Sequence, residues 1–342
     1  MYDLAVIGSG PAGYTAALLG AKAGLKTVLF EKNLSNAGGT CLNEGCIPLK
    51  GLLYYSKSTD DYSDIISTVK SKTDAIRAGL LSRLKSAGID IVEGEASFVS
   101  AGVLEAGGGK TEAKNIIIAA GSKPSRIFPG ENVYDSKKVF ELEKKPENVL
   151  IIGGGVIGCE YASFFNNIGV PVTIVEITES LLPGMDDEAV RTVAREFKKK
   201  KINIMTGSCI EEISPENEAR ITTPAGEKKE RFDVVFETTG RRAGVSALAL
   251  EKAGIETDEK GFIKTDNNMM TTAPGIYAAG DCINTPMLAY TAYAEAENAV
   301  EHILHGKTEK TDYSKIPYLV FSSPQAGTIG LSEKEARDKG MD

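Results

Sequence analysis

The strongest constraint on the fold is a glycine-rich turn that occurs twice in the same context. Residues 3–7 read as a short buried strand, followed by the turn GSGPAG, a helical segment of small and apolar residues, and a strand ending at Glu31. Residues 148–176 repeat this order, with the turn GGGVIG and the acidic residue Glu176. In both copies 23 positions separate the first glycine from the acidic residue. Each copy therefore predicts a strand–turn–helix–strand unit of the dinucleotide-binding type.

Each residue of the repeated pattern has a physical role. The first glycine permits the tight turn, the second lets the backbone approach a pyrophosphate at a helix N-terminus, and the third allows close helix–strand packing. The acidic residue can accept hydrogen bonds from a ribose hydroxyl. These residues are Gly8, Gly10, Gly13 and Glu31 in the first copy and Gly153, Gly155, Gly158 and Glu176 in the second. Two dinucleotide sites suggest one flavin and one nicotinamide cofactor.

Glu176 favours NAD over NADP for the nicotinamide site. A carboxylate accepts hydrogen bonds from a free 2′-hydroxyl but repels a 2′-phosphate, for which an Arg is usually placed nearby. Residues 177–188 contain no Arg or Lys.

Further strands complete the predicted α/β architecture, which consists of two Rossmann-like domains of the three-layer ββα type. Residues 114–124 read as a strand ending in a glycine turn. Residues 275–282 read as a strand that ends at Gly280-Asp281 before a helical stretch, which places Asp281 to bind a polyol hydroxyl. Residues 236–242 end a strand of an inserted domain. The predicted domains are 1–145 (first part of the FAD domain), 146–258 (inserted NAD domain) and 259–314 (second part of the FAD domain), followed by a short segment, 315–342.

Composition narrows the possible partners. The formal net charge is −8 and no basic stripe is present, which argues against nucleic-acid binding. No run approaches the roughly 18 apolar residues of a membrane span. The N-terminus enters a strand at once without the pattern of a signal peptide, so we expect a cytoplasmic protein without membrane partners.

Cys41 and Cys46 stand out among the five cysteines. An odd cysteine count without a signal peptide argues against a secreted disulfide framework. Residues five apart in a regular helix are about 8.6 Å apart at Cα, whereas a disulfide needs roughly 4.4–6.8 Å, so a bridge requires a distorted turn that Gly45 could permit. No second Cys/His pair has zinc-ligand spacing, so we expect no metal site. Two interpretations remain: a redox-active dithiol at a helix start, or two unrelated thiols.

The sequence resembles the pyridine nucleotide–disulfide oxidoreductases of class I, and within them the dihydrolipoamide dehydrogenase group. The matching motifs are GSGPAG, GGTCLNEGCIPLK, AAGSKP, GGGVIGCE, TTGRR, GIYAAGDC and MLAY. The resemblance implies that Cys41 exchanges with substrate, that Cys46 faces the flavin, and that Lys50 lies near the flavin and pairs with Glu160. The implied FAD contacts are Gly8, Gly10, Gly13, Glu31, Lys32, Gly39, Thr40, Lys50, Ala120, Gly121, Asp281, Met287, Leu288 and Ala289. The implied NAD contacts are Gly153, Gly155, Gly158, Glu176, Ile210 and Gly240.

The implied reaction passes electrons from dihydrolipoamide through the Cys41–Cys46 disulfide and FAD to NAD⁺. The implied partner is a lipoyl group on a carrier protein or acyltransferase, in a 2-oxo acid dehydrogenase or glycine cleavage type system, and family members are homodimers. Two alternatives are an NADH-dependent flavoprotein reductase of another disulfide and a non-catalytic FAD/NAD-binding fragment.

The chain departs from the family pattern in several places. Leu49 replaces a usual Ser, Tyr290 a usual His, and GRRAG lacks the usual Pro-Asn. Residues 316–342 look like the first strands and helix of an α+β interface domain of about 110–120 residues, which in the family supplies most of the dimer contact and a His–Glu acid–base pair. His302 and His305 lie in a predicted helix outside any such motif, and we expect them at the helix surface. The resemblance therefore implies a shortened enzyme with little lipoamide turnover.

Overall fold

The structure is a computed structural model that describes residues 1–128, 130 and 133–341. The chain divides into two compact units. The first unit comprises residues 1–44, 73–123 and 241–316, and the second comprises residues 45–72, 124–240 and 317–342. The two units differ from the predicted FAD and NAD domains in three segments. The second unit includes residues 45–72 and 124–145, which were predicted to belong to the FAD domain. The first unit includes residues 241–258, which were predicted to belong to the NAD domain.

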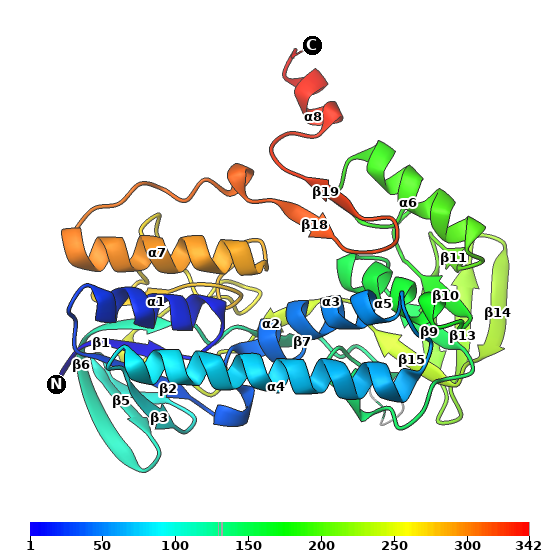
Figure 1. Ribbon diagram of the computed structural model, residues 1–342. Helices are drawn as coiled ribbons and strands as arrows, with labels where there is room; N and C mark the ends of the chain where they lie inside the picture. Colours follow the sequence, from blue (N-terminus) through cyan, green and yellow to red (C-terminus); the bar gives the residue numbers. More distant parts are fainter. Residues whose placement is uncertain (129, 131–132, 342) are drawn as a thin grey trace. The chain divides into compact units, whose positions relative to one another are not determined.

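The first unit is built on a parallel sheet in the order β3-β2-β1-β6-β17 (Figure 1). An antiparallel β4-β5-β6 layer extends from the first half of β6. The strands are β1 (Tyr2–Ile7), β2 (Thr27–Glu31), β3 (Asp90–Glu93), β4 (Ser97–Ser100), β5 (Val103–Ala106), β6 (Gly109–Ile118) and β17 (Ile276–Ala278). The central strands are continuous apolar runs, because a parallel sheet is covered on both faces.

Helices α1 (Pro11–Lys22) and α7 (Ala289–His305) pack against each other in the first unit. Small residues of α1 make this possible: Ala12, Ala16 and Ala17 are buried. Helix α2 (Gly39–Asn43) also belongs to this unit, and α4 (Tyr62–Ser86) contributes its later part. A two-stranded ladder joins β7 (Ser122–Pro124) to β16 (Arg241–Ala243).

The second unit repeats the first unit's architecture, with a parallel sheet in the order β11-β10-β9-β15-β8 and an antiparallel β12-β13-β14 sheet. The strands are β8 (Val133–Tyr134), β9 (Val149–Ile152), β10 (Val172–Val175), β11 (Asn203–Met205), β12 (Cys209–Ile213), β13 (Glu218–Thr223), β14 (Gly226–Arg231) and β15 (Val234–Glu237). Its helices include α3 (Cys46–Tyr55), α5 (Val156–Asn167) and α6 (Asp187–Lys199). Tyr161, Phe165 and Phe236 form an aromatic cluster in its core. The Rossmann-like fold predicted from the two glycine turns is confirmed for each unit.

The end of the chain contributes two short strands and a helix, as predicted. These are β18 (Tyr318–Val320), β19 (Ala326–Thr328) and α8 (Glu333–Asp338). Helix α8 starts with a capping box formed by Ser332 and Glu335.

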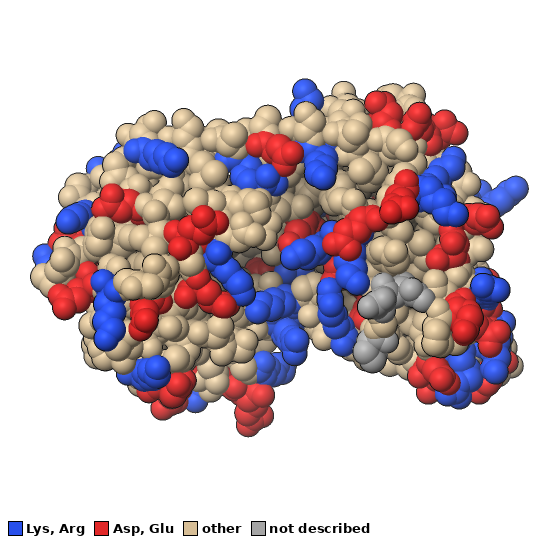
Figure 2. Space-filling model, turned by 90° about the horizontal axis from the view of Figure 1, so that it is seen from below, with Lys and Arg blue, Asp and Glu red and all other residues tan. Residues whose placement is uncertain are grey.

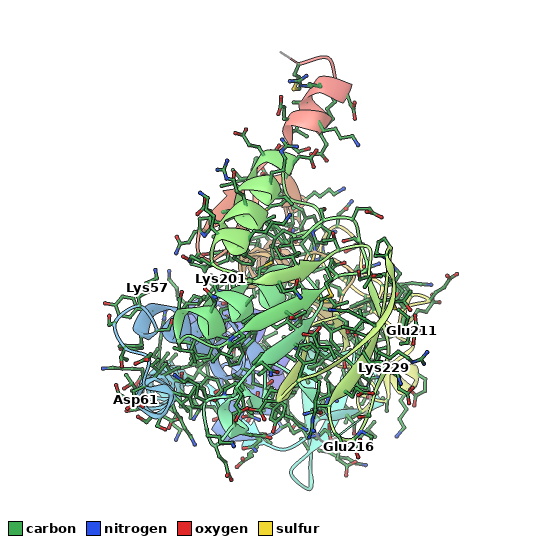
Figure 3. The ribbon with its side chains drawn as sticks, turned by 90° about the vertical axis from the view of Figure 1, so that its right-hand side faces the viewer. Lys57, Asp61, Lys201, Glu211, Glu216 and Lys229 are labelled. Atoms are coloured by element: carbon green, nitrogen blue, oxygen red, sulfur yellow. The ribbon has the colours of Figure 1, made fainter. Side chains whose placement is uncertain are left out.

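The surface carries charges of both signs. Lysine, arginine and acidic side chains are interspersed over the face shown in Figure 2. Three charged side chains project outward at the margin of the second unit (Figure 3). They are Glu211 in β12, Glu216 in the turn between β12 and β13, and Lys229 in β14. In the part of the chain that the structure describes, no helix is both long and apolar enough to cross a membrane.

Candidate active site

The first glycine turn allows close approaches that a side chain would block. Gly8 has a φ of 96°, and a Cβ there would lie 2.4 Å from the carbonyl oxygen of Ala119. A Cβ on Gly13 would lie 1.8 Å from the carbonyl oxygen of Gly8, so only glycine lets α1 start this close to β1. Gly10 is the N-cap of α1. Glu31 accepts hydrogen bonds from the backbone and hydroxyl groups of Ser9, and its other oxygen accepts from the Asn33 backbone.

The second turn reproduces this geometry. Gly153 has a φ of 105°, and a Cβ on Gly158 would lie 2.0 Å from the carbonyl oxygen of Gly153. Gly155 is the N-cap of α5, and, its sequence neighbours aside, none of the residues that the structure describes has an atom within 4 Å of the place its Cβ would take. The buried Glu176 carboxylate accepts a 2.5 Å hydrogen bond from the Gly154 backbone and 2.8 Å bonds from the Thr178 backbone and hydroxyl.

The cysteine segment is an interrupted helix. Cys41 lies in α2 of the first unit, and Cys46 is the first residue of α3 in the second unit. Between them Gly45 takes a φ of −132° and a ψ of −116°, far from helical values. The distorted turn expected around Gly45 is therefore present. Cys46 stands at the N-terminus of α3, where the helix dipole favours an anionic group.

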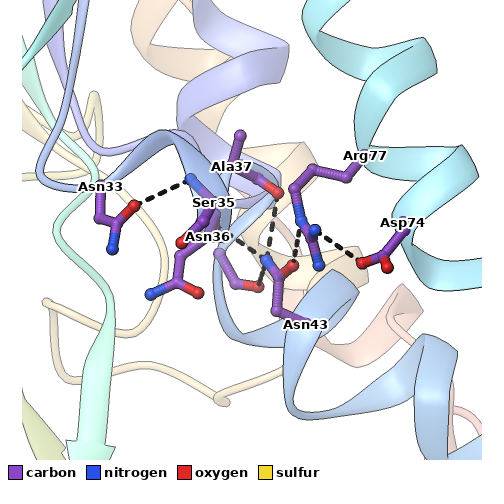
Figure 4. Close-up of polar contacts among 8 residues, drawn as sticks. Asn33, Ser35, Asn36, Ala37, Asn43, Asp74 and Arg77 are labelled. Atoms are coloured by element: carbon purple, nitrogen blue, oxygen red, sulfur yellow. Dashed lines mark hydrogen bonds and ion pairs between the residues drawn. The ribbon is translucent and has the colours of Figure 1, made fainter. Parts of the chain in front are cut away.

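Asn43, at the end of α2, ties down the loop that precedes Cys41, a role that the sequence analysis missed. Its Nδ2 group donates hydrogen bonds to the carbonyl oxygens of Asn36, Ala37 and Gly39 at 2.8–3.1 Å (Figure 4). Its Oδ1 accepts a 2.7 Å bond from Nε of Arg77, which also pairs with Asp74 at 2.8 Å. The helix of Cys41 is thus fixed by a side chain of α4, 34 positions away in the sequence.

Lys50 and Glu160 form the expected ion pair within the second unit. Lys50 Nζ lies 2.9 and 2.8 Å from the two carboxylate oxygens of Glu160. The Glu160 side chain is 1% exposed and also accepts a hydrogen bond from the Phe321 backbone, whereas Lys50 remains 32% exposed. Lys50 lies one turn after Cys46 in α3, which places both on one face of the helix.

Asp281 follows β17 and is held by two neighbours in the first unit. Its Oδ2 accepts a 2.6 Å hydrogen bond from Ser122, and the largely buried Arg241 guanidinium donates to the same Ser122 hydroxyl at 2.7 Å. Just before it, the Gly280 backbone donates a 2.7 Å bond to the fully buried Glu295 carboxylate. Burial raises the pKa of Glu295 to about 7, with the nearby Asp281 adding to the effect and hydrogen bonds opposing it.

The other predicted contact residues vary in accessibility. Several of them are half-buried: Thr40, Ala120, Gly121 and residues 287–289, before and at the start of α7. Gly240 takes a positive φ of 127°. Lys32 is exposed and pairs with Glu95. The Ile210 side chain is buried in the core under the β12–β14 sheet, so only its backbone can face a ligand.

Each histidine has a partner on or next to α7. His302 is half-buried in α7, with Nδ1 2.9 Å from the Tyr277 hydroxyl. His305 is exposed and lies 3.4 Å from Glu301.

Comparisons with known proteins agree with this geometry. Residues 2–296 match the model of the pyridine nucleotide-disulphide oxidoreductase family. The chain is 36% identical to a dihydrolipoyl dehydrogenase of Chlamydia pneumoniae and 34% identical to one of Bacillus subtilis, covering 99% and 98% of this chain and 78% of each relative. It resembles the solved HOCl-induced flavoprotein disulfide reductase RclA from Escherichia coli with a TM-score of 0.91 and 30% identity, over 100% of this chain and 80% of that one. This chain belongs to the pyridine nucleotide-disulphide oxidoreductase family.

Members of this family use FAD and NAD(P), and the residues present fit two such dinucleotides. Each glycine turn leaves a helix N-terminus without a side chain at its N-cap, which is the cradle that a pyrophosphate requires. Each turn also ends beside a carboxylate that can accept from a ribose hydroxyl.

Proposed function

We propose that this chain is a disulfide oxidoreductase of the dihydrolipoyl dehydrogenase type, which moves electrons between dihydrolipoamide and NAD⁺. The observation that carries the proposal is the α3 arrangement, in which Cys46 starts the helix and Lys50, one turn later, is held by the buried Glu160. A helix N-terminus favours a thiolate, and Cys46 stands at that position of α3. The proposed partner is a lipoyl group on a carrier protein or acyltransferase.

In the proposed reaction the chain's own thiols exchange with the substrate. Starting from the Cys41–Cys46 disulfide, a substrate thiolate attacks the Cys41 sulfur; the Cys41–Cys46 bond breaks, a mixed disulfide forms at Cys41 and Cys46 leaves as a thiolate. The second substrate thiol then attacks the mixed disulfide, closes lipoamide and releases Cys41, so that the chain is left with a dithiol. The two electrons leave as hydride to NAD⁺ and one proton is released. When bound, FAD supplies the electron relay between the dithiol and the nicotinamide.

NAD⁺ is the proposed acceptor because of Glu176. Its carboxylate is buried and held by Gly154 and Thr178, so it presents a fixed acceptor where a 2′-phosphate would be repelled. The following residues 177–188 supply no cation.

We propose that dihydrolipoamide turnover by this chain alone is slow. Proton transfer by a positioned base contributes about 10²–10⁴-fold to such reactions. The two histidines of the chain contact other side chains: His302 lies beside Tyr277 and His305 beside Glu301. We therefore assign neither histidine as the base for the cysteine pair.

The test is anaerobic reduction of the FAD-loaded chain by NADH. We expect two newly titratable thiols and a long-wavelength thiolate–flavin band, both absent in Cys46→Ser, while Cys41→Ser keeps the band. The same preparation should oxidise dihydrolipoamide with NAD⁺ at a low but measurable rate, faster than with NADP⁺. Absence of both the thiol release and the band would overturn the proposal.

A second candidate is a reductase of a different disulfide. The resemblance to the disulfide reductase RclA favours it, because that structure matches the whole chain. A panel of disulfides, with NADH consumption as the measurement, separates the two: a rate with another disulfide that clearly exceeds the rate with lipoamide would favour the second candidate.

A further inference from the structure

Three segments of the first unit meet at one arginine. The segments are helix α2 with Thr40, the start of β7 with Ser122, and the turn of Asp281 after β17. Arg241 contacts all three of them. Arg241 begins β16, directly after Gly240, and its side chain is only 12% exposed. The sequence analysis assigned no role to this residue.

The hydrogen bonds run in one direction from the cation to the carboxylate. Arg241 Nε donates to the Ser122 hydroxyl at 2.7 Å, and that hydroxyl donates to Asp281 Oδ2 at 2.6 Å. Arg241 Nη2 donates to the Ser122 carbonyl oxygen at 2.9 Å and to the Thr40 hydroxyl at 3.3 Å. Because a guanidinium can only donate, it fixes the Ser122 hydroxyl as an acceptor from Arg241 and a donor to Asp281.

This relay leaves one oxygen of Asp281 available. Oδ2 is occupied by Ser122, while Oδ1 has no hydrogen-bond partner among residues 1–128, 130 and 133–341. The Asp281 side chain is 24% exposed, so Oδ1 can accept from a ligand. Arg241 Nε lies 3.9 Å from Oδ2, within ion-pair distance, so the guanidinium contacts the carboxylate directly as well as through Ser122.

We propose that Arg241 is a positioning residue for the flavin half of the FAD site: through Ser122 it orients Asp281 toward a polyol hydroxyl, and through Thr40 it ties the cysteine-bearing helix α2 to the same point. This inference rests on the proposed function in that it requires FAD in the first unit. The proposed role of Arg241 concerns only the flavin half of the FAD site. In the adenine half the expected acceptor is Glu31, which is held by Ser9 and not by Arg241.

The experiment measures binding of FAD and of ADP to the apo-protein, by quenching of flavin fluorescence and by calorimetry. In Arg241→Met we expect the Kd for FAD to rise roughly 10- to 100-fold, because Asp281 loses its oriented donor, while the Kd for ADP stays within about twofold. Arg241→Lys keeps the charge but not the fork and should fall between the wild type and Arg241→Met. Arg242→Met, at the exposed neighbouring position, is the matched control and should bind both ligands normally.

Each outcome decides the proposal. Equal loss of FAD and ADP affinity, or unchanged FAD affinity in Arg241→Met, would overturn it. If Arg241→Met unfolds, Ser122→Ala removes the relay while retaining the cation and should show the same selective loss of FAD. A wild-type chain that binds no FAD would instead refute the proposed function itself.

Discussion

The two glycine turns have nearly the same backbone but differ in what covers them. In the first turn, Gly39 packs against Gly10: a Cβ on Gly39 would lie 2.7 Å from the Gly10 Cα, and Gly39 has a φ of 62°. In the second turn, the described part of the chain places no atom beyond the immediate neighbours of Gly155 within 4 Å of its Cβ position. The first turn is thus closed by the loop that leads to Cys41, and the second is open at the same point.

The difference suits the two expected ligands. A flavin that stays bound benefits from a turn covered by the chain, whereas a nicotinamide dinucleotide that must enter and leave in each cycle benefits from an open one. We therefore expect the covering segment, rather than the glycine motif, to decide which turn retains its dinucleotide and which exchanges it.

The largest predicted effect comes from placing a methyl group at the third glycine of each turn. Gly13→Ala and Gly158→Ala each put a Cβ within about 2 Å of a backbone oxygen, so helix and strand must separate. We expect Gly13→Ala to lose at least ~100-fold in FAD affinity. Gly158→Ala should retain FAD but lose a similar factor in the rate of flavin reduction by NADH at low NADH concentration.

The matched control for these variants is Gly79→Ala in α4, where a Cβ would meet no atom of the described residues within 4 Å apart from the adjoining backbone of its own helix. It should bind both cofactors normally and gain up to about 1 kcal/mol in stability. Loss of FAD in Gly158→Ala would show that the two turns do not act separately.

The second prediction concerns Glu295, a buried carboxylate specific to the first unit. Its pKa is about 7 in the folded protein and ordinary in the unfolded chain, so the folded state binds the proton more tightly. Its contribution to stability is present below about pH 4.5 and is lost as the pH rises to about 7. The groups facing it are the Gly280 backbone, Tyr313, Asp281 and Cys282.

The measurement is the free energy of unfolding in urea between pH 5 and pH 8. The free energy of unfolding of the wild type, minus that of Glu295→Gln, should fall by on the order of 3 kcal/mol as the pH rises. Glu297→Gln, at an exposed position of the same helix, should give a difference without this slope. A pH-independent difference for Glu295→Gln would contradict the prediction.

The third prediction addresses Lys50 and Glu160, the ion pair specific to the second unit. Lys50→Met leaves a buried carboxylate whose remaining hydrogen bond comes from the Phe321 backbone. Since Lys50 is partly exposed, we expect a loss of about 2 kcal/mol in the free energy of unfolding, smaller than for a fully buried pair. The double variant Lys50→Met/Glu160→Gln should recover most of this loss, whereas Lys57→Met, at an exposed position just beyond α3, should cost little. Additive losses in the double variant would disprove the coupling.

The sequence predicted what depends on local pattern. The glycine spacings required the two turns, and the motif around Cys41 and Cys46 led to the Lys50–Glu160 pair. Gly45 within the motif signalled the helix interruption. These features are short-range or belong to recognisable motifs.

The supporting contacts could not be predicted in the same way. Arg77 reaches Asn43 and Arg241 reaches Ser122 across 34 and 119 positions, and such pairs depend on the tertiary fold. Glu295 did carry a signal: it shares a helical face with Ala292, Ala296 and Ala299, all buried. An acidic residue at that spacing indicates a carboxylate in the core.

The smallest predicted effect concerns the residue after the first glycine, where the turns differ in sequence. Ser9 donates its hydroxyl to Glu31 and accepts from the Gly38 backbone, whereas Gly154 can use only its backbone toward Glu176. Ser9→Ala removes the hydroxyl contacts but keeps the backbone bond to Glu31. We expect a loss of about 1 kcal/mol in the free energy of unfolding, because Glu31 is only half-buried and water can replace part of the bond. The control is Ser35→Ala, at an exposed position of the segment between β2 and α2. A loss above about 3 kcal/mol would mean that Ser9, through Gly38, holds the whole covering loop, and the closure of the first turn would then depend on this hydroxyl rather than on the Gly39–Gly10 contact.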